Sequence, residues 1–234
     1  MFGVSQNYVF DMFVFVFFCS ITTAGGTCVL LEGPLSLIEL DDERLTHLKD
    51  VPTVISKARI PQSIRHVHVG GEALSQSVLA NVSAHVVLTN DYGPTEASVN
   101  VAAKRVNRKH LAEKLGSIGC PFQNVTAYII DPDTLALQPQ GVPGELWLGG
   151  VQVARGYLNR PEKTAEVFIA PPWPETDPSG RGVVYRTGDR VRWYADGEIE
   201  FGGRIDFQVR AEPMATPCPV VFCLLYTSPS PRDS

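Results

Sequence analysis

Residues 85–96 read HVVLTNDYGPTE, and this stretch decides the expected fold. His85–Thr89 is rich in apolar and β-branched residues, which predicts a strand that ends just before the Asn90–Gly93 segment. Upstream, Arg65–Val69 predicts a second strand, and Gly70-Gly71-Glu72 follows it. In open parallel sheets, ligands bind beyond the carboxyl ends of the strands. Both segments are therefore well placed to form a site.

Strand-like and helix-like segments alternate through residues 28–105, which favours an α/β fold with a mainly parallel sheet. Cys28–Leu31 predicts a further strand. The helix-like segments are Asp42–Leu48, Thr53–Arg59 and Leu74–Ala80. The apolar run Val9–Cys19 predicts a buried helix or strand, because a bilayer span needs about 20 residues. A membrane role for this run is the alternative.

Beyond residue 118 the chain consists of short β-rich segments separated by Gly, Pro and Asp turns. These segments are Val125–Asp131, Gly144–Leu148, Gly182–Arg186, Arg190–Tyr194 and Glu198–Phe201. Their spacing is typical of an antiparallel sheet or a small barrel. One expected helix, Arg160–Phe168, interrupts them, and Pro161 suits its first turn. We therefore divide the chain into an α/β part, residues 1–117, and a distorted β-barrel-like part, residues 118–203.

The composition indicates a globular protein and argues against some partners. Apolar residues make up 44% of the 234 residues, and the formal net charge is −5. An acidic chain lacks the basic face that displaces counterions from nucleic acid, so no nucleic-acid partner is expected. The five cysteines form no C-x-x-C pair, so neither a zinc site nor a disulfide framework is expected. The cytoplasm is the expected compartment, without a membrane partner.

The Asn90–Glu96 segment carries residue types that suit a nucleotide site. The aromatic face of Tyr92 can stack on a base, the Thr95 hydroxyl can meet a phosphate oxygen, and the Glu96 carboxylate can hold Mg²⁺. Taken alone, the segment is equally compatible with a plain tight turn. Further motifs are needed to decide between these interpretations.

Four more strings accompany this segment in a defined order. They are Val69–Leu74 (VGGEAL), Gly144–Gly150 with Val153–Leu158 (GELWLGG and VARGYL), Tyr185–Asp189 (YRTGD) and Gly203–Val209 (GRIDFQV). In this order and spacing, the strings resemble the core motifs of the adenylate-forming, AMP-binding enzymes, particularly the amino-acid adenylation domains of nonribosomal peptide synthetases. The similarity runs from about Val9 to Val209. It implies an internal fragment of the family's large subdomain, in which a mainly parallel sheet with helices is followed by a small distorted β-barrel.

The resemblance implies that the chain uses ATP and Mg²⁺. Tyr92 looks like the residue that stacks on adenine, with Asn90 near the exocyclic amine. Glu96 looks like the Mg²⁺ ligand, and Asp189 looks like the carboxylate that accepts both ribose hydroxyls. The predicted cofactor-binding residues are Gly71, Glu72, Asn90, Asp91, Tyr92, Gly93, Thr95, Glu96, Asp189 and Arg204.

Two other arginines in the motifs, Arg155 and Arg186, are interpreted as members of structural ion pairs rather than as catalytic residues.

The same resemblance places an amino-acid pocket after Phe10-Asp11. Asp11 would bind the α-ammonium group of the substrate, and a helix-capping role is the alternative. The predicted lining is Asp11, Met12, Phe15, Lys49, His68, Gly70, Asp91, Val99 and Asn100. Lys49 favours an acidic or polar substrate side chain, because a buried ammonium without a partner is costly, unless Asp91 neutralises it internally.

The implied reaction joins an amino acid and ATP into an aminoacyl-adenylate and passes the acyl group to a carrier-protein thiol. The alternatives are a fragment of an acyl-CoA or aryl-CoA ligase of the same superfamily and a non-catalytic nucleotide-binding remnant. The family's Ser/Thr/Gly-rich phosphate loop and its C-terminal subdomain with the catalytic Lys are expected to be missing, so the chain alone is expected to be inactive. Residues 204–210 resemble the family's hinge, with Asp206 at the hinge position. Residues 211–234 are expected to be an unrelated, artefactual tail.

Overall fold

The computed structural model describes residues 1–22, 25–31, 44–108, 114–172 and 182–205, apart from the Ile21 side chain. The first strands are β1 Phe2–Val4, β2 Cys28–Leu30, β3 His47–Asp50, β4 His66–Gly70, β5 Val87–Tyr92 and β6 Ala102–Arg105. The later ones are β7 Ser117–Pro121, β8 Val125–Ile130, β9 Gly144–Gly150, β10 Phe168–Ile169, β11 Val184–Trp193 and β12 Ile199–Arg204. The helices are α1 Asp11–Thr22, α2 Pro52–Ile55, α3 Gln76–Asn81 and α4 Pro161–Val167, with a 3-10 helix, η2, at Thr95–Ala97.

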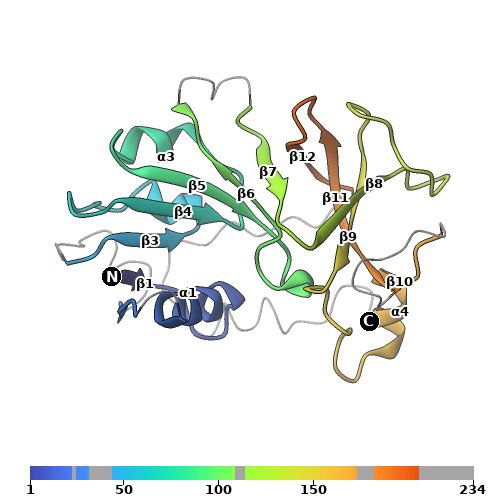
Figure 1. The fold of residues 1–234 in the computed structure, drawn as a ribbon, viewed down its shortest axis with the longest axis horizontal. Coiled ribbons are helices and arrows are strands. Elements are labelled where there is room, and N and C mark those ends of the chain that lie inside the picture. The colour runs from blue at the N-terminus through green and yellow to red at the C-terminus, as the bar shows by residue number, and fades with distance from the viewer. Residues whose placement is uncertain (23–24, 32–43, 109–113, 173–181, 206–234) are drawn as a thin grey trace, which may run out of the picture.

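The strands form one sheet in the order β2-β1-β3-β4-β5-β6-β7-β12-β11-β9-β8, and β10 pairs with β11. Figure 1 shows that the sheet has two parts, which meet at β6 and β7. The pairs from β2 to β5 are parallel, and those from β5 onward are antiparallel. The expected α/β fold class is confirmed. The boundary at residue 118 stays a prediction, since β7 hydrogen-bonds to strands of both parts.

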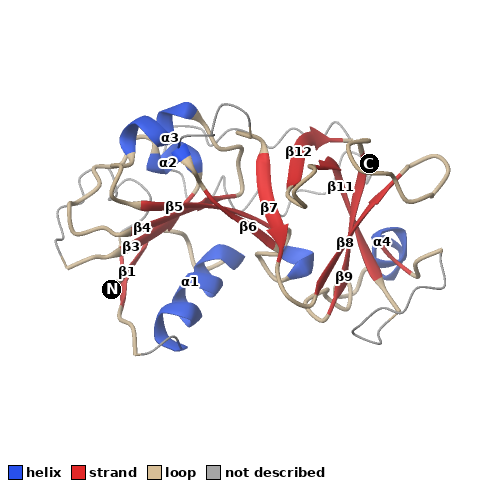
Figure 2. Cartoon of the chain, turned by 45° about the horizontal axis from the view of Figure 1, so that its top comes forward, coloured by secondary structure: helices blue, strands red, loops and turns tan. Residues whose placement is uncertain are grey.

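Each part of the sheet has its own hydrophobic core. In the parallel part, α2 and α3 cover one face and α1 lies on the other (Figure 2). Val67 of β4 and Val78 of α3 are completely buried in the core between them. In the antiparallel part, Leu146 of β9 and Ile199 of β12 belong to a separate buried cluster. Because a continuous sheet joins the two cores, the ends of β5 and β12 lie close to the middle of β11.

One predicted helix is wrong. The sequence predicts a helix over Asp42–Leu48, but strand β3 begins at His47, and residues 44–46 are not helical. Asp42 and Glu43 lie outside the described residues. Strand β3 pairs with β4 along its whole length, and Leu48 is 1% exposed in the core. Burial of this strand in the sheet overrides its local helical preference.

Other expected elements exist with different bounds. Most of Gly182–Arg186 and Arg190–Tyr194 belongs to one strand, β11 at Val184–Trp193, which has an irregular register between Arg186 and Arg190. Asn90–Tyr92 belongs to β5 instead of following it. The expected helix at residues 160–168 is α4, and it begins at Pro161. Strand β1 has no counterpart among the predicted elements.

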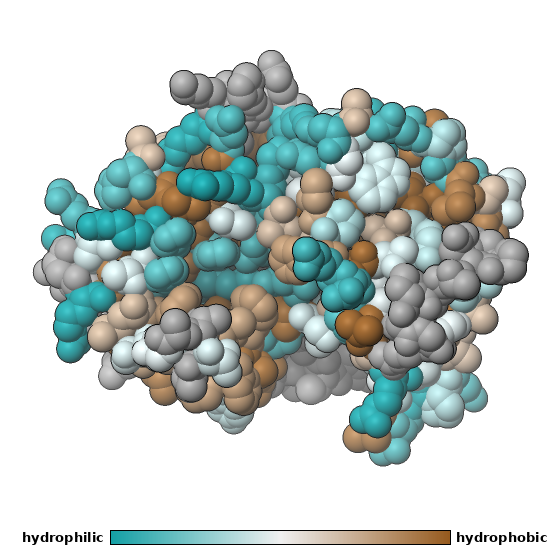
Figure 3. Space-filling view, in the orientation of Figure 1, coloured by the Kyte–Doolittle hydropathy of each residue, from teal (hydrophilic) through white to brown (hydrophobic). Residues whose placement is uncertain are grey.

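The apolar run at residues 9–19 mostly forms α1, which is only partly buried. Val16 is 3% exposed, whereas Val14 and Phe18 face solvent. Figure 3 shows apolar side chains gathered on the surface in the region of α1. Within the described ranges, no helix has both the length and the apolar character that a membrane crossing requires.

Asp50 at the end of β3 is a buried carboxyl group. Asp50 is 2% exposed. The Ser5 hydroxyl donates to its Oδ2, and the Val51 amide donates to its Oδ1 at 2.7 Å. Burial raises the pKa of Asp50 to about 6, despite these hydrogen bonds. The folded state therefore retains a proton between about pH 4 and about 6 that the unfolded chain has already released. Asp50 consequently lowers the free energy of unfolding as the pH rises through this window.

We expect Asp50→Asn to be more stable than the parent above pH 6. The difference should shrink as the pH falls, by at most about 1.4 kcal/mol per pH unit. Burial lowers the pKa of His47 to about 4, so its contribution has the opposite sign and is lost as the pH falls below 6.5. Subtracting the parent's urea-unfolding free energy from the variant's at each pH removes the His47 contribution. A pH-independent difference would show that Asp50 keeps an ordinary pKa.

Candidate functional site

Three predicted cofactor-binding residues meet where a side chain at the end of β5 reaches β11, next to the end of β12. The Tyr92 hydroxyl, at the end of β5, donates to Asp189 Oδ2. Arg204 Nη1, at the end of β12, lies 3.2 Å from Asp189 Oδ1 and also donates to the Thr187 carbonyl at 2.8 Å. The Asp189 side chain is 4% exposed, and a buried carboxylate of this kind requires such donors. Residues 97 positions apart thus form one cluster.

The irregularity in β11 directs Asp189 toward this cluster. Thr187 Oγ1 donates to the Leu146 carbonyl at 2.7 Å and accepts the Asp189 amide at 3.0 Å. Gly188 has a φ of +70°, which glycine adopts without strain, and its amide donates to Glu145 Oε1 at 3.1 Å. The string YRTGD therefore encodes a local departure from regular strand geometry that positions its final carboxylate.

Glu145 also accepts Arg186 at 2.9 Å, which confirms the structural ion pair expected for that arginine. Within the described residues no ion pair of Arg155 is seen, so its interpretation stays a prediction.

The chain after Tyr92 forms a tight loop. The Tyr92 ring lies 6.2 Å from the Phe201 ring, between centroids, and the Val101 amide donates to the Tyr92 carbonyl at 2.8 Å. Ser98 and Val99 have φ values of 62° and 73°. A β-branched residue with a positive φ is rare, and such strained residues cluster at functional sites. The loop holds η2, and with it Thr95 and Glu96, close to the end of β5.

Thr95 and Glu96 each bind a different neighbouring segment. The Thr95 hydroxyl donates to Asp11, the first residue of α1. Glu96 Oε1 accepts the Tyr157 hydroxyl at 2.6 Å, and the Glu96 carbonyl accepts the Ala154 amide at 2.8 Å. Tyr157 lies in the VARGYL string, but no role for it could be inferred from the sequence.

The donor set around Glu96 fits Mg²⁺ held jointly with a nucleotide. Within the described ranges, no group of three or more His, Cys, Asp or Glu side chains is arranged as a metal cage. Mg²⁺ is usually held by one or two carboxylates together with substrate phosphates, and it does not need a complete protein cage. A single carboxylate beside a hydroxyl matches that pattern.

Other predicted cofactor residues make different contacts. The Asn90 amide is buried and donates to the Ser117 carbonyl at 3.0 Å. Glu72 Oε2 accepts both the Thr53 amide at 3.0 Å and the Thr53 hydroxyl at 2.5 Å. Glu72 therefore satisfies donors in the first turn of α2. Their predicted contacts with ATP remain predictions.

Glycines at the ends of β4 and β5 allow close backbone approach. A Cβ on Gly70 would lie 2.7 Å from the Asp91 carbonyl, and Gly71 has a φ of +83°. A Cβ on Gly93 would lie 2.7 Å from Asn100 Cα. A side chain at Gly70 would thus collide with the backbone of Asp91, and a side chain at Gly93 would collide with the backbone of Asn100.

Most of the predicted amino-acid pocket comes together at the ends of β3, β4 and β5. Lys49 Nζ lies 2.6 Å from Asp91 Oδ2, with side chains 4% and 5% exposed. His68 Nδ1 lies 3.2 Å from the same oxygen. Lys49 Nζ also lies 4.5 Å from the Phe15 ring centroid. When the Asn100 amide is oriented to satisfy its neighbours, its oxygen accepts a hydrogen bond from Lys49 Nζ at 2.7 Å.

The charges in this cluster are balanced internally. Burial raises the pKa of Asp91, but the hydrogen bond from His68 and the charge of Lys49 outweigh burial, so the pKa is lowered overall. Asp91 is therefore ionised and neutralises Lys49. Lys49 then needs no negative charge from the substrate, so it no longer favours an acidic substrate side chain. Met12 and Val99 lie beside this cluster, next to Gly71 and Gly93 respectively. Asp11 accepts the Thr95 hydroxyl, so a predicted pocket residue contacts a predicted cofactor-binding residue.

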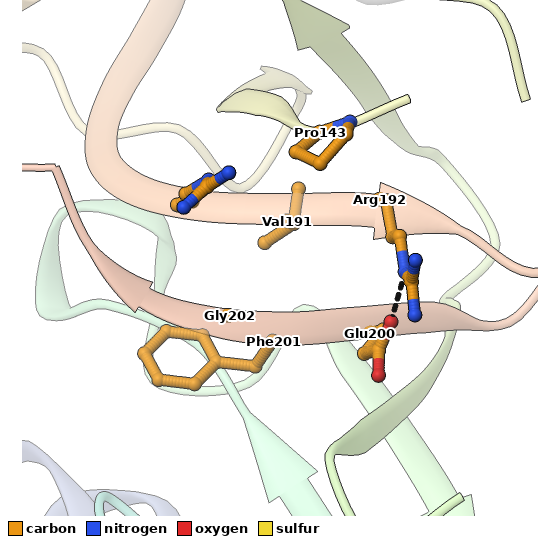
Figure 4. A pocket seen from close by; sticks show the side chains of 7 residues that line it. Pro143, Val191, Arg192, Glu200, Phe201 and Gly202 are labelled. Carbon is orange, nitrogen blue, oxygen red and sulfur yellow. Dashed lines mark hydrogen bonds and ion pairs between the residues drawn. The ribbon is translucent and has the colours of Figure 1, made fainter. Parts of the chain in front are cut away.

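A pocket of about 200 Å³ lies elsewhere, on the antiparallel part (Figure 4). Val191 and Pro143 line it, and the Arg192–Glu200 ion pair lies at one end. None of its seven lining residues is a predicted site residue. Asp206, the predicted hinge residue, and residues 207–234 lie outside the described residues.

The chain resembles several known proteins. A family model described as "AMP-binding enzyme" matches residues 5–158. Gramicidin S synthase 2 of Brevibacillus brevis is 38% identical over 219 residues, covering 87% of this chain and 5% of that protein. Nonribosomal peptide synthetase 7 of Aspergillus fumigatus is 37% identical over 200 residues, covering 81% of this chain and 8% of that protein. The solved structure of PA1221, described as an NRPS protein containing adenylation and PCP domains, has a TM-score of 0.76 at 25% identity and covers 89% of this chain.

The chain spans only a small share of these proteins: 5% and 8% of the two synthetases and 44% of the solved chain. Within that share, the family match, the sequence identity and the fold agree with the motifs and with the cluster around Asp189. The chain therefore belongs to the AMP-binding enzyme family and corresponds to a stretch of a nonribosomal peptide synthetase adenylation domain.

Proposed function

We propose that this chain forms the adenine-, ribose- and magnesium-binding part of a ligase that activates an amino acid as its adenylate. One observation carries the proposal: Tyr92, Asp189 and Arg204 form a single cluster although they come from three separate strands. An aromatic ring beside an anchored, buried carboxylate suits a nucleoside, which has a flat base and a diol. Tyr92 would stack on the base, and Asp189 would accept the ribose hydroxyls.

Thr95 and Glu96 would serve the phosphate end of the nucleotide. Both belong to η2, which lies within the loop that begins after Tyr92. Glu96 would hold Mg²⁺ through its carboxylate, and the Thr95 hydroxyl would lie beside the phosphates. Bound there, Mg²⁺ would supply charge neutralisation on the phosphate oxygens.

The amino acid would lie against the Lys49–Asp91–His68 cluster, with Asp11 on its α-ammonium group. Because Asp91 balances the charge of Lys49, we propose a polar rather than an acidic substrate side chain. The His68 side chain is 35% exposed, whereas the Lys49 and Asp91 side chains are buried. His68 is therefore the member of the cluster that a substrate would touch.

The reaction would proceed in two steps. An oxygen of the amino-acid carboxylate attacks the α-phosphorus of ATP, the bond from that phosphorus to the leaving oxygen breaks, and aminoacyl-AMP and pyrophosphate form. A carrier-protein thiolate then attacks the acyl carbon, which gives a thioester and AMP. Such steps depend mainly on positioning and charge stabilisation, which these residues would contribute. A cytoplasmic setting is part of the same proposal.

We expect the purified 234-residue chain to bind ATP and AMP weakly without catalysing amino-acid-dependent ATP–pyrophosphate exchange. We expect neither the family's phosphate loop nor its catalytic Lys among these residues, and loss of one well-placed donor alone commonly costs about 10²–10³ in rate. Calorimetry with ATP and AMP, with CTP as the control nucleotide, tests binding, and radiolabelled pyrophosphate tests exchange. Failure to bind either adenine nucleotide would refute the nucleotide site, and robust exchange would refute the expected inactivity.

The alternatives can be separated in the adenylation domain that contains this chain. Exchange with amino acids but not with aryl or fatty acids supports the amino-acid ligase. Exchange with the latter compounds supports the acyl-CoA or aryl-CoA ligase, and nucleotide binding without exchange supports a non-catalytic remnant.

A further inference from the structure

The loop that connects β9 to α4, residues 151–160, is bonded to the segment that carries Glu96. The Ala154 amide donates to the Glu96 carbonyl at 2.8 Å, and the Ser98 hydroxyl donates to the Gln152 carbonyl at 2.8 Å. A third bond reaches the Glu96 carboxylate itself: the Tyr157 hydroxyl donates to Oε1 at 2.6 Å. Two bonds therefore hold the backbone of the segment, and a third orients its functional group.

Tyr157 is itself held from several directions. Its amide donates to Thr164 Oγ1 at 2.9 Å, and Thr164 Oγ1 donates to the Arg160 carbonyl at 2.9 Å. The Tyr157 ring packs edge-on against Phe168, with 5.5 Å between centroids, and Phe168 is 9% exposed. The position of the phenol is therefore set by a packed ring and an anchored backbone, independently of Glu96.

We propose that Tyr157 is a positioning residue for Glu96, holding Oε1 so that Oε2 is presented to the magnesium ion of the nucleotide. This inference rests on the proposed function, because it assumes that Glu96 is the cation ligand. A carboxylate on a short 3-10 helix would otherwise sample several rotamers, and ordering it on binding would cost conformational entropy. Hydrogen bonds to the ligands of metal ions typically strengthen binding by fixing their orientation.

The phenol hydroxyl has one proton to donate, and it donates that proton to Glu96 Oε1. A purely structural role would depend on the ring, which packs on Phe168, and removal of the hydroxyl alone would then have little effect.

The test uses Tyr157→Phe in the 234-residue chain, with calorimetric ATP binding measured at increasing Mg²⁺ concentration. We expect the Mg²⁺ concentration for half-maximal enhancement of ATP binding to rise roughly 10-fold, as for other groups that orient metal ligands. AMP binding without Mg²⁺ should be unchanged, because it does not involve Glu96. Tyr194→Phe is the matched control, since the Tyr194 hydroxyl also faces a carboxylate, Glu200, and should leave the Mg²⁺ dependence unchanged.

A second comparison separates positioning from general destabilisation. In a Glu96→Gln background, Tyr157→Phe should cause no further shift, because the two residues act through one bond. Thr164→Val, which frees the Tyr157 backbone without touching the phenol, should shift the Mg²⁺ dependence in the same direction by a smaller factor. This variant decides the question if Tyr157→Phe does not fold.

The outcomes distinguish this inference from the proposed function. If the parent shows Mg²⁺-enhanced ATP binding and Tyr157→Phe or a folded Thr164→Val matches it, the positioning role is overturned and the nucleotide site stands. If AMP affinity falls as much as the Mg²⁺ dependence shifts, Tyr157 acts on the whole site and the inference is also overturned. If the parent binds no adenine nucleotide, both proposals are wrong.

Discussion

Asp189→Asn is expected to weaken ATP and AMP binding by about 100-fold, because charge-assisted hydrogen bonds to a buried carboxylate are among the strongest polar contacts. The amide has one acceptor oxygen in place of two, and Arg204 already bonds to one oxygen of the carboxylate. The Asn side chain is nearly the same size, so the bulged strand that carries it should persist. Calorimetry with both nucleotides measures the effect.

The ribose assignment can be tested more directly with an analogue that lacks both ribose hydroxyls. For the parent, the analogue should bind much more weakly than ATP, whereas for Asp189→Asn the two should bind about equally. Asp131→Asn is the matched control, because Asp131 lies in the same antiparallel part and accepts turn amides away from the cluster. An unchanged preference for the ribose hydroxyls in Asp189→Asn would contradict the assignment.

Lys49→Met is expected to lower the free energy of unfolding by about 3–5 kcal/mol, the usual cost of breaking a buried ion pair by removing one partner. The variant leaves the Asp91 carboxylate buried, with His68 as its remaining close donor. Protonation of Asp91 would relieve part of the cost, so the loss should be smaller at acidic pH. Urea unfolding at neutral and acidic pH measures both effects.

Two comparisons identify the cause of that loss. Lys49→Met combined with Asp91→Leu should recover much of the stability, because no uncompensated charge remains. Lys114→Met provides a more exposed comparison. Lys114 pairs with Asp196 and Glu198 near the surface, where solvent screens the charges, so its removal should cost much less stability than Lys49→Met. If Lys49→Met costs no more than Lys114→Met, the Lys49–Asp91 pair does not stabilise the fold as proposed.

Sequence reasoning was most successful where a local signal had one physical interpretation. Pro161 opens α4 because its ring suits a first helical turn and lacks an amide that needs a partner. The β-rich segments after residue 118 alternate with turn residues and form an antiparallel sheet. The Asp42–Leu48 prediction failed because pairing with β4 and burial of Leu48 make the segment end in a strand.

The candidate site shows the same limit. The motifs indicated Tyr92, Asp189 and Arg204 as partners of one nucleotide, but their spacing along the chain contains no information about direct contact. The sequence also left open whether Asp91 neutralises Lys49, and it assigned no role to Tyr157. Those relations depend on which strands become neighbours, and that choice is made by the packing of the two cores.

The sequence by itself determined the family, the α/β class and the residue types available for nucleotide chemistry, because these depend on local patterns and ordered motifs. Tertiary structure alone decided that β3 is a strand, that Asp91 neutralises Lys49 and that Tyr157 reaches Glu96. Each of these outcomes depends on contacts between segments that are distant in the chain. Such contacts form, and contribute to the free energy of folding, only when the sheet has assembled.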